Sequence, residues 1–106
     1  MTITPAKILL LAVCAVSAHT HAQDLNALQA TARHCLTLAG AARLCGQPDA
    51  GLDALCQQLV QRSGLPQQSA WQASNQGTQG RWISPYGGTT CQDITRQTRD
   101  FKQQAR

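Results

Sequence analysis

Residues 24–66, DLNALQATARHCLTLAGAARLCGQPDAGLDALCQQLVQRSGLP, contain the two patterns that decide the fold. In the first half, apolar residues recur at the i, i+3, i+4, i+7 spacing of one buried helix face. Asp24 precedes this repeat as an N-cap, and Gly46 follows it as a C-cap. The repeat consists of Leu25, Leu28, Ala32, Cys35, Leu36, Ala39 and Ala42.

A second helix is predicted after a short turn. Pro48 and Asp49 supply the turn and the next N-cap, and Gly64 and Pro66 end the helix. The sequence therefore predicts a mostly α-helical chain built on a helical hairpin. The apolar face of this second helix consists of Leu52, Leu55, Cys56, Leu59 and Val60.

The remainder of the chain is predicted as a short third helix, an irregular loop and a C-terminal helix. The third helix covers residues 66–76, and the loop covers residues 77–89, which are rich in glycine. Thr90 and Asp93 have capping-box spacing and predict the start of the final helix. The third helix has a face of Ala70, Trp71 and Ala73, and the final helix one of Ile94, Thr98, Phe101 and Ala105.

The N-terminal 22 residues have the organisation of a secretory signal peptide. Lys7 forms a positive n-region, and residues 8–16 form an apolar h-region. Small residues fit cleavage after Ala18 or after Ala22, and the second site leaves a chain that begins just before the first predicted helix. We therefore expect a signal peptide over residues 1–22 and a single small helical domain over residues 23–106.

Two other interpretations of this segment place the chain outside the cytoplasm as well. A lipoprotein signal would be cut before Cys14, and an uncleaved segment would act as a membrane anchor. The apolar stretch is shorter than the ~20 residues that a spanning helix needs, which favours cleavage. The sequence thus predicts export to the periplasm or the extracellular space.

Four cysteines remain once Cys14 leaves with the signal peptide, and an even number in an oxidising compartment predicts two disulfides. Cys35 and Cys45 are ten residues apart on one predicted helix, a rise of about 15 Å. A disulfide requires Cα atoms within ~7 Å, so these two pair elsewhere unless the helix breaks near Gly40. The predicted pairs are Cys45 with Cys56 and Cys35 with Cys91, and the alternative joins Cys35 to Cys56.

The residue types present give little evidence for a catalytic site. The chain has no Glu, and three of its five Asp residues have predicted capping roles. It contains no C-x-x-C motif, zinc-binding spacing, phosphate-binding loop or nucleophile elbow. We therefore expect a protein that is not an enzyme and that holds no cofactor or resident metal. Cleavage after Ala18 would instead expose His19 and His21 at the N-terminus, a site for Cu(II) or Ni(II).

Two features predict contact with another protein. Arg81, Trp82 and Tyr86 lie in the glycine-rich loop, where rigid aromatic groups present a large contact area, although Trp82 is also predicted to close the core. The C-terminal helix has a basic face. A solvated helix end, where basic side chains complement the helix dipole, would explain the same pattern without a partner. The face consists of Arg99, Lys102 and Arg106, with Arg96 nearby.

These observations predict an exported, non-enzymatic protein-binding module of the inhibitor or immunity type. The alternative is a structural or accessory subunit of a cell-envelope or secretion assembly, docked through the basic C-terminal helix onto a partner or an anionic membrane surface. A second alternative is N-terminal Cu(II) or Ni(II) binding. Residues 23–106 carry eight basic and five acidic side chains, a net charge of 8 minus 5, or +3, which disfavours nucleic acid as a partner.

Overall fold

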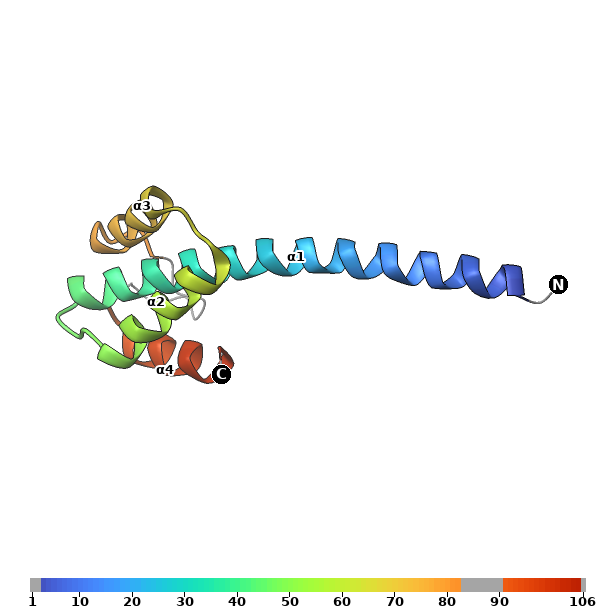
Figure 1. Ribbon diagram of the computed structural model, residues 1–106. Coiled ribbons are helices and arrows are strands. Elements are labelled where there is room, and N and C mark those ends of the chain that lie inside the picture. Colours follow the sequence, from blue (N-terminus) through green and yellow to red (C-terminus); the bar gives the residue numbers. More distant parts are fainter. Residues whose placement is uncertain (1–2, 83–90, 106) are drawn as a thin grey trace.

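The computed structural model describes residues 3–82 and 91–105, with side chains from Asp24 onward. Four helices follow one another along the chain, and the described residues contain no strand, which confirms the mostly α prediction. In Figure 1 the three shorter helices gather around the C-terminal half of the long first one. The helices are α1 (Ile3–Leu44), α2 (Ala50–Ser63), α3 (Gln67–Thr78) and α4 (Ile94–Gln104).

Helix α1 runs without a break through Asp24 and Gly40. The prediction that Asp24 caps the start of a helix is therefore wrong. Residues 6–22 contain no glycine or proline to end the helix, so it continues across them. Among the described residues, no helix is both long enough and apolar enough to cross a membrane.

The end of α1 and both ends of α2 agree with the predicted caps. Gly46 has φ 70°, and its N–H donates to the carbonyl of Arg43, while the N–H of Gln47 donates to the carbonyl of Ala42. This pair of bonds is a Schellman motif, which the left-handed backbone of glycine permits. Asp49 accepts a hydrogen bond of 2.8 Å from the N–H of Leu52, and Gly64 ends α2 with φ 67°. The predicted helical hairpin is thus confirmed.

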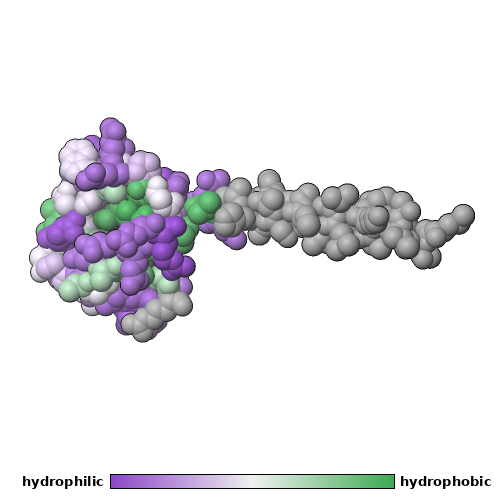
Figure 2. Space-filling view, in the orientation of Figure 1, coloured by the Kyte–Doolittle hydropathy of each residue, from purple (hydrophilic) through white to green (hydrophobic). Residues whose placement is uncertain are grey.

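The core lies between α1 and the helices that surround it. Leu52, Cys56 and Leu59 of α2 are buried against the face of α1 that carries Cys35 and Leu38. Ile94 closes the core from α4, and most other buried residues of α1 are alanines. Because alanine side chains are short, neighbouring helices come close to the axis of α1. Figure 2 shows mainly hydrophilic side chains around smaller hydrophobic areas on the visible face of this cluster.

Helix α3 touches the backbone of α1 directly. A Cβ atom on Gly77 would overlap the carbonyl oxygen of Thr37 and lie 2.7 Å from the backbone nitrogen of Ala41. A Cβ atom on Gly40 would overlap the carbonyl oxygen of Ser74 in the same way. Thr37 adds a hydrogen bond of 2.9 Å from its hydroxyl to the carbonyl of Ala73. Helix α3 is therefore held by close backbone contact rather than by large apolar side chains.

Helix α4 begins at Ile94 and not at the predicted capping box. Asp93 is the N-cap residue, its side chain makes no capping hydrogen bond, and Thr90 lies outside the described residues. The helix is fixed instead by the burial of Ile94 and by an ion pair of 3.0 Å between Lys102 and Asp49. Since Asp49 also caps α2, this carboxylate links the start of one helix to the end of the other.

The two disulfides join Cys35 to Cys56 and Cys45 to Cys91, with Cα–Cα distances of 5.4 and 5.3 Å. The predicted pairs, Cys45 with Cys56 and Cys35 with Cys91, are therefore wrong, and the alternative for Cys35 is correct. The reason is the position of Cys56 along α2. Cys56 is six residues after Ala50, about 9 Å along the helix, so it lies away from the turn that holds Cys45. Cys45 stays at the turn, where it meets Cys91 just before α4.

Peptide mapping without reduction checks this connectivity. Trypsin combined with a protease that cuts before Asp separates all four cysteines into different peptides. We expect residues 34–43 to be linked to residues 53–62, and residues 44–48 to residues 82–92. A link between residues 44–48 and 53–62 would contradict the structure. In the loop-entropy model the Cys35–Cys56 bridge contributes about 3 kcal/mol and the Cys45–Cys91 bridge about 4 kcal/mol of stability.

Candidate binding surfaces

The residues that the sequence singles out in the glycine-rich segment do not form one exposed cluster. Arg81 is exposed, but Trp82 is only 9% exposed and belongs to the hydrophobic core. The indole N–H of Trp82 donates to the side-chain oxygen of Gln97. Of the two predictions for Trp82, the structure favours the core role over a partner contact. Tyr86 lies outside the described residues.

The predicted basic face of α4 is partly used inside the fold. Lys102 donates to both carboxylate oxygens of Asp49, so it holds α4 against α2. The hydrogen bond from Leu52 and then the bond from Lys102 lower the pKa of Asp49. Arg99 pairs with Asp100 at 3.3 Å and keeps a side chain that is 63% exposed. Arg106 lies outside the described residues, so the exposed part of the basic face is Arg99, with the exposed Arg96 nearby.

Trp71 on α3 is the most exposed large apolar side chain among the described residues, at 66% exposed. The predicted face of Ala70, Trp71 and Ala73 is therefore wrong with respect to Trp71. Residues 71 and 73 are about 200° apart around a helix, so burying Ala73 turns Trp71 outward. Gly77 follows Ala73 by four residues and shares its buried face.

Trp71 projects from a helix that has no charged residue of its own. The exposed side of α3 includes Gln67 and Gln68 one turn before Trp71. Arg43 of α1 donates to the hydroxyl of Ser74 at 2.8 Å, which adds to the backbone contact described above. The indole is thus presented from a helix that is firmly attached to α1.

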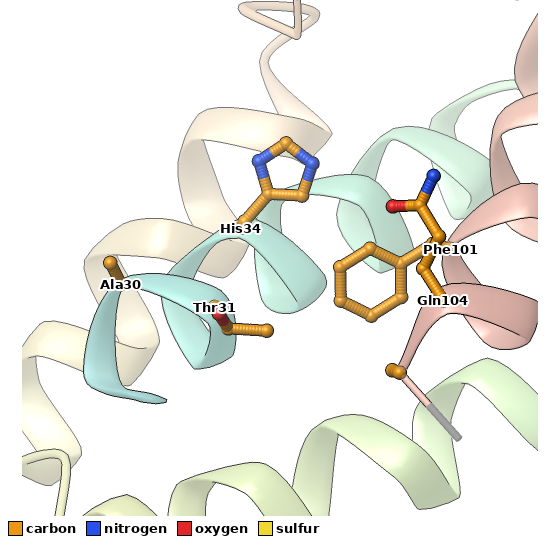
Figure 3. A pocket seen from close by; sticks show the side chains of 6 residues that line it. Ala30, Thr31, His34, Phe101 and Gln104 are labelled. Atoms are coloured by element: carbon orange, nitrogen blue, oxygen red, sulfur yellow. The ribbon is translucent and has the colours of Figure 1, made fainter. Parts of the chain in front are cut away.

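A groove of about 450 Å³ opens between α1 and α4. In Figure 3, His34 of α1 and Phe101 of α4 face one another across it. Their rings are nearly parallel, with centroids 5.6 Å apart, and Trp82 lies edge-on to His34 at 4.4 Å. The groove is lined by Ala30, Thr31, His34, Phe101, Gln104 and Ala105.

Partial burial favours the neutral form of His34. His34 itself remains exposed, but partial burial of its imidazole lowers the pKa from the ordinary value of 6.5. The imidazole is therefore mainly uncharged at neutral pH. Two charged residues line the adjoining hollows, Arg33 of α1 and Asp100 of α4. Within the described part of the chain, no three His, Cys or Asp side chains gather in a way that could hold a metal ion.

Comparison of the chain with protein-family models, with curated proteins and with solved structures found no match in any of the three.

The sequence interpretation missed Trp71 as an exposed residue and did not single out His34 as a groove residue. For Trp71 a signal was available, because the angle between positions 71 and 73 separates them on any helix. For His34 the signal was weaker: it precedes Cys35, whose burial places His34 at the edge of the core.

Unfolding at different pH values tests the environment of His34. The unfolded chain takes up a proton near pH 6.5, whereas the folded protein does so only at a lower pH. Between these two values the unfolded state binds more protons, so the free energy of unfolding should fall as pH drops below about 6.5. His34→Gln should abolish this slope. A slope that is unchanged in the variant would contradict the assignment to His34.

Proposed function

We propose that this chain is an exported, disulfide-bonded, non-enzymatic protein-binding module whose contact surface is centred on Trp71. The two disulfides fit an oxidising compartment outside the cytoplasm. The predicted signal peptide over residues 1–22 supports the same location, in the periplasm or outside the cell. A partner of the inhibitor or immunity type, with an apolar pocket for the indole, fits this surface.

The exposure of Trp71 is the observation that carries the proposal. The chain has four aromatic residues, two of them Trp, and its core is built largely from alanine and leucine. A fold with so few large apolar groups would gain stability by burying each of them. Instead α3 leaves one indole 66% exposed. Trp is also the residue type most enriched at the energetic centre of protein interfaces.

The way α3 is attached supports tight binding at this surface. Association costs free energy when side chains and segments must be ordered at the interface. Here the helix is fixed by the contacts of Gly40 and Gly77, and a Trp side chain has only two rotatable angles. Little ordering is therefore left to be done when a partner covers Trp71.

A structural or accessory role in a cell-envelope assembly, docked through the basic C-terminal helix, is the second candidate. The exposed guanidinium of Arg99 favours it, and the use of Lys102 within the fold weakens it. Contact through basic side chains would release at high salt, whereas contact through an indole would not. Copper or nickel binding at His19 and His21 stays a prediction that depends on cleavage after Ala18.

Replacing Trp71 by Ala tests the proposal against the second candidate. The exported fraction of the native host is passed over the immobilised protein, and the affinity of the stoichiometric partner is then measured. We expect Trp71→Ala to weaken binding by about 30-fold, or about 2 kcal/mol, with an unchanged melting temperature. Gln67→Ala is the matched control on the same helix and should bind nearly normally.

Charge reversal at Arg99 tests the second candidate, docking through the basic C-terminal helix. If Arg99→Glu abolishes binding while Trp71→Ala retains it, and if the wild-type complex dissociates at high salt, the basic helix is the docking surface and the proposal is wrong.

A further inference from the structure

A small cavity of about 90 Å³ is lined by residues of α1 and α4 and by Trp82. It shares His34, Phe101 and Gln104 with the groove, so the two hollows adjoin one another. Trp82, Gln97 and Asp100 complete most of its lining. The cavity has room for about three water molecules, or for the head of a larger molecule whose body lies in the groove.

Gln97, one of the residues that line this cavity, has a buried hydrogen-bond donor that is not used. The residue is 4% exposed, and its side-chain nitrogen Nε2 is buried without a hydrogen-bond partner among the described residues. A buried amide nitrogen that lacks a partner is costly, and native proteins leave few of them unpaired. The position therefore calls for an acceptor that the chain itself does not supply.

The direction of the Gln97 amide is fixed by Trp82. The indole nitrogen can only donate, so the group that faces it has to be the Gln97 oxygen Oε1. A flipped amide would set two donors against each other. Nε2 consequently stays turned away from the indole.

The cavity walls narrow the chemistry of that ligand. Trp82, Phe101 and the mainly neutral His34 offer aromatic surfaces, which suit an apolar body. Among the described residues, the cavity lining contains no Lys or Arg that would attract an anion, and its carboxylate, that of Asp100, is paired with Arg99. We propose that this cavity and the adjoining groove bind a small uncharged molecule that carries a carbonyl or hydroxyl oxygen on an apolar body, with that oxygen accepting from Nε2 of Gln97.

Nuclear magnetic resonance titration of the ¹⁵N-labelled protein with benzamide tests the site. Benzoate and toluene are matched probes, the first with a charged acceptor and the second with none. The Gln97 side-chain amide is identified by its contact with the indole proton of Trp82. We expect benzamide to shift both signals and to bind about tenfold more tightly than either control probe.

Two variants complete the experiment. Gln97→Met keeps the shape of the side chain without the donor and should bind benzamide no better than toluene. Trp71→Ala should bind benzamide normally, because Trp71 lies on the outer side of α3. Loss of benzamide binding is therefore a separate result from loss of binding to a protein partner. If Gln97→Met does not fold, the titration of the wild-type protein with the three probes still tests the inference. Equal binding of benzoate, or no shift of the Gln97 signals with benzamide, would overturn the inference.

Discussion

Direct backbone contact between α1 and α3 is the constraint on which the rest of the structure depends. Gly40 and Gly77 leave no room for a Cβ atom on either side. Helix α3 buries Ala73 and Gly77, neither of which brings much apolar area, so dispersion contacts and hydrogen bonds at short range have to hold it. The same short side chains on α1 let α2 and α4 pack closely, and Cys35 and Cys45 tie them in place.

The hairpin was predictable because its signals are local. Asp49, Gly46 and Gly64 each act within a few residues of their own position, so the sequence alone places the turn and both helix ends. Features that depend on depth or angle were not predicted correctly. Cys56 pairs with Cys35 because of its distance along α2, and Trp71 is exposed because Ala73 is buried.

The candidate sites depend on contacts between distant parts of the chain, which residue types alone do not indicate. His34 and Phe101 come into contact only when α4 packs against α1. The orientation of the Gln97 amide likewise depends on the indole of Trp82. The sequence predicts a basic face on α4, of which Arg99 and Lys102 lie within the described residues. Its use could not be predicted, because the partner of Lys102 is the N-cap of another helix. Both candidate surfaces are thus consequences of how the helices are assembled around α1.

The most direct test of this account is the stability of Gly77→Ala, measured by urea unfolding beside Gly51→Ala. In an unhindered helix, alanine is favoured over glycine by about 1 kcal/mol. A Cβ atom at Gly51 meets nothing closer than 3.2 Å, from the Asp49 side chain, so Gly51→Ala should change the free energy of unfolding by about 1 kcal/mol or less. Gly77→Ala should lower it by about 3 kcal/mol, because the backbones of α1 and α3 must separate. A Gly77→Ala protein as stable as the wild type would contradict the account.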